Sequence, residues 1–182
     1  NIAIIGVTGL VGKKILDFTG GLGVLGLGHN HQKILDARIN FQKQNKMEVH
    51  KILFSNYMGA LAKNIAMLLP KNLNKSFFLN SGAEAVEAAI KVCFKSYNSK
   101  KKNILFSNKS YHGKLIGSGS VSGSYIKNNQ FPIMENCISF NFNDPIDLEK
   151  KILHCQKNAG VYAVIIEPYS ASLLESCSQE FI

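Results

Sequence analysis

Apolar positions along the chain alternate between a helical period and short continuous runs. The helical period predicts helices over residues 32–44, 59–69, 83–97 and 145–158. The apolar runs predict strands over residues 76–79, 103–106, 137–142 and 161–166, the last of them covered on both faces of a parallel sheet. Strands that alternate with helices in this way predict an α/β fold, a three-layer α/β/α arrangement around a mostly parallel sheet.

The first residues have a different pattern. Residues 1–5 form a β-branched run, a glycine-rich turn follows over 6–12, and a helix is expected to start at 13–16. The sequence of residues 1–16 resembles the amino terminus of aspartate-semialdehyde dehydrogenases. Closely spaced glycines then interrupt the crossover helix that a dinucleotide-binding unit requires, so we expect loops and short strands over 17–31. We therefore divide the chain into 1–16, a dinucleotide-loop-like strand and turn, 17–75, and a cofactor-binding part, 76–182.

The charge and the cysteines exclude several classes of function. The net charge is +9, but it comes from 20 scattered lysines and one arginine, Arg38, so we expect no nucleic-acid partner. No apolar run reaches the roughly 18–20 residues of a membrane span, and no membrane partner is expected. The four cysteines form no C-x-x-C pair, which argues against a metal site and favours reduced thiols in a cytoplasmic protein.

The start of the predicted helix 83–97 is a candidate anion site. Gly82 permits a tight turn after the strand 76–79, and the N–H groups of the first helical turn can bind a phosphate. Ser81 and Glu84, however, also have the spacing of an ordinary capping box. The spacing alone leaves both interpretations open.

Two further positions follow predicted strands. Tyr111, after the strand 103–106, could stack on a flat cofactor, and His112 beside it could act as an acid or base or serve a structural role. Glu167, after the strand 161–166, could orient a cofactor, pair with a cation, or cap a helix. In parallel sheets, ligands bind at the carboxyl ends of strands, which makes these residues candidates for one site.

The segments 17–24, 28–31, 78–91, 110–114 and 165–168 together resemble the class III pyridoxal-phosphate aminotransferases, such as the acetylornithine, ornithine and 4-aminobutyrate enzymes. The resemblance implies part of the large domain of these transferases, with pyridoxal 5'-phosphate as cofactor. It implies cofactor-binding roles for Ser81, Gly82, Ala83, Tyr111, His112 and Glu167, with Tyr111 stacked on the pyridine ring and Gly113 shaping the loop. Lys114 stands where many members carry a substrate-binding arginine.

The implied activity is amino transfer from a small-molecule amino donor to a 2-oxo acid, in a homodimer. The family's Schiff-base lysine and its ring-binding aspartate match nothing in these 182 residues, so we assign no catalytic residue and expect an incomplete chain that is inactive alone. One alternative is a non-catalytic binding or assembly module on the same fold. Another is an NADP-dependent semialdehyde dehydrogenase fragment, although no cysteine has the required context. The donor, the acceptor and the nature of the join near residues 16–17 stay open.

Overall fold

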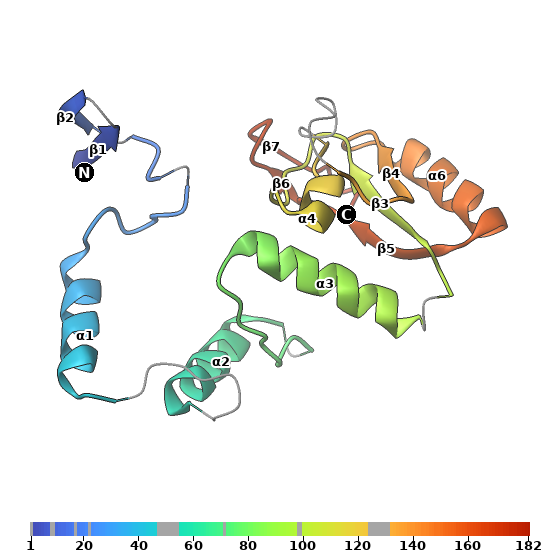
Figure 1. The fold of residues 1–182 in the computed structure, drawn as a ribbon. Helices are drawn as coiled ribbons and strands as arrows, with labels where there is room; N and C mark the ends of the chain where they lie inside the picture. The colour runs from blue at the N-terminus through green and yellow to red at the C-terminus, as the bar shows by residue number, and fades with distance from the viewer. Residues whose placement is uncertain are drawn as a thin grey trace. The chain divides into compact units, whose positions relative to one another are not determined.

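A computed structural model describes residues 2–7, 10–16, 18–21, 23–46, 55–70, 72–97, 100–123 and 132–182. The chain divides into two compact units, Asn1–Lys75 and Ser76–Ile182 (Figure 1). The candidate site residues all belong to the second unit.

The first unit begins with a β-hairpin. Strand β1 (Ile2–Val7) pairs antiparallel with strand β2 (Leu10–Leu16), from Ile2 opposite Leu16 to Val7 opposite Leu10. The sequence between the paired ends is Thr8-Gly9, and a two-residue connection containing glycine is typical of hairpins. The helix start expected at 13–16 is therefore wrong, because these residues hydrogen-bond to β1 as a strand.

Turns and two helices make up the rest of this unit. Gly20, Gly21, Gly23 and Gly28 have φ between 58° and 82°, which strands do not adopt, and the short strands expected over 17–31 are not found among residues 18–21 and 23–31. Helix α1 (Gln32–Lys43) follows the predicted range closely. Helix α2 (Asn56–Leu68) starts three residues before the predicted range, because Ser55 caps it by accepting the Met58 N–H at 3.4 Å.

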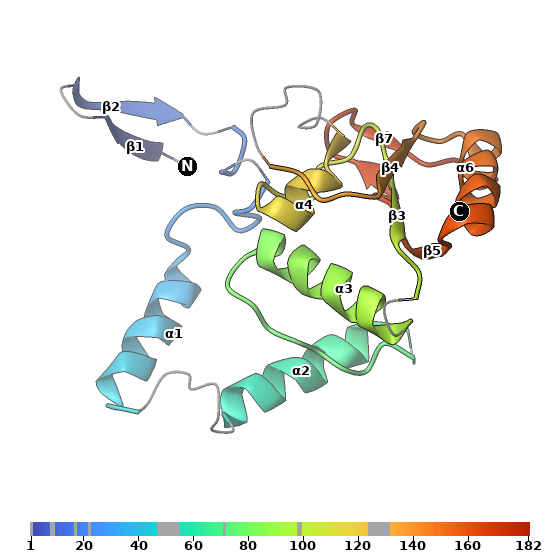
Figure 2. The same ribbon diagram turned by 45° about the vertical axis from the view of Figure 1, so that its right-hand side comes forward.

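The second unit has three layers. Strand β3 (Asn103–Ser107) lies between β4 (Cys137–Phe140) and β5 (Val161–Ile165), and it is parallel to both. Helix α3 (Gly82–Ser96) and helix α6 (Pro145–Asn158) lie on opposite faces of this sheet (Figures 1 and 2). The predicted three-layer α/β/α fold with a mostly parallel sheet is confirmed, although β4 ends two residues earlier than expected.

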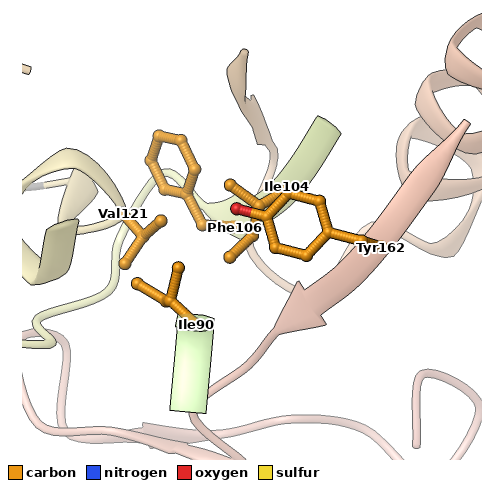
Figure 3. Close-up of a cluster of buried hydrophobic side chains, with 5 residues drawn as sticks. All are labelled: Ile90, Ile104, Phe106, Val121 and Tyr162. Atoms are coloured by element: carbon orange, nitrogen blue, oxygen red, sulfur yellow. The ribbon is translucent and has the colours of Figure 1, made fainter. Parts of the chain in front are cut away.

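Two apolar clusters separate these layers. Ile104 and Phe106 of β3 pack with Ile90 of α3, and Val121 and Tyr162 complete this cluster (Figure 3). The intervening residue Leu105 points to the other face, where it packs with Phe140 and with Cys155 of α6. The alternation along β3 follows from the pleat of a strand, which directs successive side chains to opposite faces.

Strand β3 is the more fully covered of the two strands, and the expectation that residues 161–166 would be covered on both faces holds in part, since Tyr162 packs in the cluster beside α3 and Val161 against the cluster beside α6. All five residues of β3 are buried, whereas β5 lies at the edge of the described sheet and Val164 is 38% exposed. Composition alone did not separate the two strands, because both are continuous apolar runs. The difference arises from which side chains the helices and loops cover, and that packing depends on distant segments.

The strand predicted at 76–79 is absent. These residues form no ladder with any described strand, and Phe77 is 79% exposed. An apolar run becomes a strand only where a neighbouring strand accepts its hydrogen bonds. The sequence patterns also missed three short elements: helix α4 (Ile116–Ser120), and the antiparallel pair β6 (Tyr169–Ser170) and β7 (Glu175–Ser176).

Three features bear on the excluded classes of function. Cys93, Cys137, Cys155 and Cys177 are all free thiols. Among the described residues, no group of three or more His, Cys, Asp or Glu side chains could hold a metal ion, and no described helix is long and apolar enough to cross a membrane. In the lysine run at 100–102, Lys101 places its Nζ 4.0 Å from the centre of the Tyr97 ring.

Candidate functional site

The N-terminus of α3 carries backbone N–H donors that the helix itself does not use. Ser81 is extended and caps the helix, since its Oγ accepts the Glu84 N–H at 3.2 Å and donates to Glu84 Oε2 at 3.3 Å. The capping interpretation of this spacing therefore holds for Ser81. The N–H groups of Gly82 and Ala83 find no acceptor among the described residues, and a Cβ added to Gly82 would meet nothing within 4 Å. The Ser81 cap uses only the Glu84 N–H, so the N–H groups of Gly82 and Ala83 can still bind an anion.

The loop after β3 packs directly against this helix end. Gly113 has a φ of +126°, and a Cβ placed on it would lie 2.6 Å from the Cβ of Ala83. The neighbouring His112 donates its backbone N–H to Ser122 Oγ at 2.7 Å, which holds the loop in place. The first and second candidate positions are therefore adjacent.

Glu167 joins the same group of residues. Its Oε1 accepts the Tyr111 N–H at 3.0 Å, a contact across the parallel neighbours β3 and β5. Its Oε2 is buried and has no hydrogen-bond partner among the described residues. The carboxylate thus fixes the loop that carries Tyr111, and it does not cap a helix. All three positions predicted from the sequence meet at the carboxyl edge of the sheet.

The side chains at this edge differ in exposure. The Tyr111 side chain is 43% exposed and Lys114 is exposed, while His112 is half-buried. His112 Nε2 is buried without a partner among the described residues, and burial lowers the pKa of this imidazole below its usual value of 6.5.

The residues fit a phosphorylated aromatic cofactor on three counts. The N–H groups of Gly82 and Ala83 have no acceptor among the described residues and lie at the positive end of a 15-residue helix, where a phosphate is stabilised. An accessible aromatic ring follows β3, and two buried polar atoms, His112 Nε2 and Glu167 Oε2, have no hydrogen-bond partner in the part of the chain that the structure describes. Such a set can hold an anion, stack on a ring and hydrogen-bond to ring substituents.

Sequence reasoning missed the hydroxyl groups that shape the loop. Ser110 Oγ bonds to the carbonyl oxygens of Ser107 at 2.7 Å and of Val121 at 3.0 Å, and Ser122 Oγ donates to the Ser118 carbonyl at 2.8 Å. All four of these serines are at most 2% exposed. The available signal was the alternation of serine and glycine over 117–123, which suits buried turns tied by short side chains.

The lowered pKa of His112 predicts an acid-sensitive fold. The unfolded chain binds the proton more readily than the folded one, so stability is full above pH 6.5 and falls as the pH decreases through that value. Urea unfolding at pH 7.5 and pH 5.5 should show this loss, and His112→Asn should reduce it. The matched variant His154→Asn, at an exposed position of α6, should keep the full difference. If His112→Asn and the unchanged chain lost the same stability between pH 7.5 and pH 5.5, protonation of His112 would not be the cause of the loss.

Comparisons with known proteins agree on one family. The family model for class-III aminotransferases matches residues 5–173. Over 161 residues the chain is 34% identical to the putrescine aminotransferase of Pectobacterium atrosepticum, covering 86% of this chain and 34% of that protein. It is 35% identical over 159 residues to the acetylornithine aminotransferase of Bacillus cereus, covering 86% and 38%. The chain thus spans a little over a third of the length of these relatives.

Solved structures show the same fold. A transaminase from the marine bacterium Virgibacillus has a TM-score of 0.81 at 22% identity, over 93% of this chain and 41% of that one. The ornithine aminotransferase of Toxoplasma gondii has a TM-score of 0.70 at 22% identity, over 88% and 38%. The family match begins at residue 5 and so includes most of the first sixteen residues, whose resemblance to a dehydrogenase these comparisons do not support. The chain belongs to the class-III aminotransferases, a family of pyridoxal-phosphate-dependent enzymes.

Proposed function

We propose that the second unit binds pyridoxal 5'-phosphate for the transfer of an amino group from an ω-amino donor to a 2-oxo acid. The observation that carries the proposal is the convergence of the α3 N-terminus, the Tyr111 loop and Glu167. Ala83 contacts the position of Gly113, and Glu167 accepts the Tyr111 N–H. When bound, the cofactor supplies an electron-withdrawing ring that stabilises negative charge on the substrate carbon.

Each residue has a separate part in this proposal. The N–H groups of Gly82 and Ala83 bind the phosphate, joined by the Ser81 hydroxyl when its proton turns from Glu84 Oε2 to the phosphate, and the helix field contributes about 0.3–1 kcal/mol. The Tyr111 ring covers one face of the cofactor ring, a contact worth about 0.5–1.5 kcal/mol. The buried Glu167 Oε2 and His112 Nε2 supply hydrogen-bonding atoms to the ring's polar substituents.

Lys114 is the proposed substrate contact. It is exposed and directly follows Gly113, so its ammonium group can approach a substrate carboxylate beside the cofactor. A lysine acts as a mobile point charge, while an arginine would present a planar pair of donors. We therefore expect this chain to orient the carboxylate less strictly than an arginine at the same position would.

The donor class, the assembly and the location are also proposals. The names of the relatives, putrescine aminotransferase and acetylornithine aminotransferase, support a donor with an amino group far from its acid end. We propose a homodimer in the cytoplasm, where the four thiols would stay reduced. We also propose that these 182 residues alone do not transaminate, because none of the 20 lysines has the family's covalent-binding context.

Calorimetric titration of the 182-residue chain tests the cofactor site. Pyridoxamine phosphate is the ligand of choice because its amine cannot form an imine with lysines, and pyridoxamine, which lacks only the phosphate, tests the need for that group. We expect pyridoxamine phosphate to bind at least about tenfold more tightly than pyridoxamine, given the phosphate's charge-assisted bonds. Tyr111→Ala should weaken binding about three- to tenfold through loss of stacking.

Tyr97→Ala is the matched control, because Tyr97 is also 43% exposed but lies at the opposite end of α3. It should leave the affinity unchanged. Equal affinity for the two ligands, or equal losses in the two tyrosine variants, would overturn the proposed site. With the cofactor, an ω-amino donor and 2-oxoglutarate present, we expect no turnover, and measurable turnover would refute the proposed inactivity.

A further inference from the structure

We propose that Glu87 is a positioning residue, which holds the loop carrying Tyr111 and His112 against the cofactor end of α3. This inference rests on the proposed function of that loop. Glu87 lies one turn into α3, and its Oε1 accepts the backbone N–H of Ser118 at 2.7 Å. The Glu87–Ser118 contact joins α3 to α4, and both views of the fold draw α4 beside the N-terminal half of α3 (Figures 1 and 2).

Helix α4 needs a cap from outside its own sequence. Its N-cap residue is Leu115, whose side chain has no hydrogen-bonding atom. Ser118 Oγ is already used, since it accepts the Leu115 N–H at 3.1 Å. The Ser118 N–H therefore depends on the carboxylate of Glu87, which satisfies an N-terminal amide that would otherwise lack an acceptor.

Gly117 is shaped to receive this carboxylate. A Cβ added to Gly117 would lie 2.6 Å from Glu87 Oε2 and 2.8 Å from Oε1. Because the carboxylate is the end of a flexible side chain, an alanine at 117 would displace it without moving the backbone. Replacement of Gly117 should thus remove the same contact as truncation of Glu87.

The Glu87–Ser118 contact is the middle one of three along one face of α3. Ala83 faces Gly113, Glu87 faces Gly117 and Ser118, and Ile90 shares a buried cluster with Val121 (Figure 3). Positions 83, 87 and 90 lie on one side of a helix. This face of α3 therefore contacts the segment 113–121 at three places: ahead of α4 at Gly113, in the first turn of α4 at Gly117 and Ser118, and just after α4 at Val121.

Hydrogen bonds connect Glu87 to the cofactor loop. The Ser118 N–H binds Glu87, and the Ser118 carbonyl accepts the hydroxyl of Ser122 at 2.8 Å. Ser122 Oγ in turn accepts the His112 N–H at 2.7 Å. Loss of the Glu87 carboxylate should therefore change the position of residues 111–113, although Glu87 itself need not contact the cofactor.

Affinity for pyridoxamine phosphate tests the positioning role. Glu87→Ala should weaken binding about tenfold, and Glu87→Gln, which retains an oxygen acceptor, should stay within about threefold of the unchanged chain. Glu149→Ala, at an exposed position of α6, is the control and should bind normally. In a Tyr111→Ala background, Glu87→Ala should add clearly less than its full tenfold loss, because one of the two side chains that it positions is already absent.

Gly117→Ala should reproduce the loss seen in Glu87→Ala, and the double variant should be no weaker than either single variant. Additive losses would overturn the inference. Equal losses in Glu87→Ala and Glu149→Ala would overturn it as well, as would a full additional loss in the Tyr111→Ala background.

Amide hydrogen exchange of residues 113–120, measured without cofactor, separates this inference from the proposed function. Exchange at the Ser118 amide should rise at least about tenfold in Glu87→Ala and Gly117→Ala, but not in Glu149→Ala. Unchanged exchange would refute the Glu87–Ser118 contact even if the cofactor binds. Faster exchange with normal affinity would refute the positioning role alone. Failure of the unchanged chain to bind pyridoxamine phosphate, with faster exchange in the variants, would refute the proposed function and with it the positioning role, but not the contact.

Discussion

Gly113→Ala should abolish detectable binding of pyridoxamine phosphate and lower the free energy of unfolding by more than about 3 kcal/mol. A φ of +126° is a glycine-only conformation, and a side chain there costs about 1–3 kcal/mol in backbone strain. The new Cβ would also lie 2.6 Å from Ala83 Cβ and 3.0 Å from Ala83 Cα. Relief of this overlap requires the loop to move away from the start of α3, which separates the proposed phosphate site from Tyr111.

Gly119→Ala is the matched control in the same segment. A Cβ on Gly119 would have its nearest neighbours at 3.8–3.9 Å, which is ordinary van der Waals contact. This variant should retain cofactor affinity and stability, since alanine also favours the helical conformation of α4. Calorimetric titration and urea unfolding of both variants provide the measurement. Normal affinity in Gly113→Ala would show that close approach of loop and helix is not required.

The sequence was sufficient to bring the candidate site residues together. Tyr111 and Glu167 each follow a predicted strand, and Gly82 precedes a predicted helix. Because β3 and β5 are parallel neighbours, the two strand ends meet, and the observed contact is the bond from the Tyr111 N–H to Glu167. Residues that directly follow two strands therefore lie close together when those strands are parallel neighbours in the sheet.

The residues that support the site were beyond sequence reasoning. Glu87 looks like one of several polar residues on an amphipathic helix, and nothing local indicates that it accepts the N–H of Ser118, 31 positions later. The same holds for Ser122, whose hydroxyl binds His112. Such hydrogen bonds depend on how two elements pack together. The spacing of apolar residues predicts which face of a helix is buried, but not which distant residue its polar side chains contact.

The errors in the fold have a common physical cause. Residues 13–16 were expected to start a helix, and 76–79 to form a strand. In both cases the decisive factor is whether another strand pairs with the segment: β1 pairs with 13–16, and no described strand pairs with 76–79. The pairing of 13–16 is local, through a two-residue connection, whereas a partner for 76–79 would have to come from a distant segment, which a short apolar run does not encode.

The position of the enclosed strand leads to the second large expected effect. Leu105→Ala should lower the free energy of unfolding by about 2–5 kcal/mol, because Leu105 is fully buried between the sheet and α6 and its truncation leaves a cavity. Val164→Ala, in the edge strand β5, should cost less than about 1 kcal/mol, because Val164 is 38% exposed and its neighbours can relax. Both strands are continuous apolar runs, so composition alone would predict similar losses.

Urea unfolding followed by circular dichroism measures both values, and the slopes should agree so that the midpoints can be compared. Leu105→Met, which nearly conserves volume, should cost less than about 1.5 kcal/mol and so separates the cavity from any general sensitivity of β3. Equal losses in Leu105→Ala and Val164→Ala would mean that Val164 is packed as fully as Leu105, against its exposure at the edge of the described sheet.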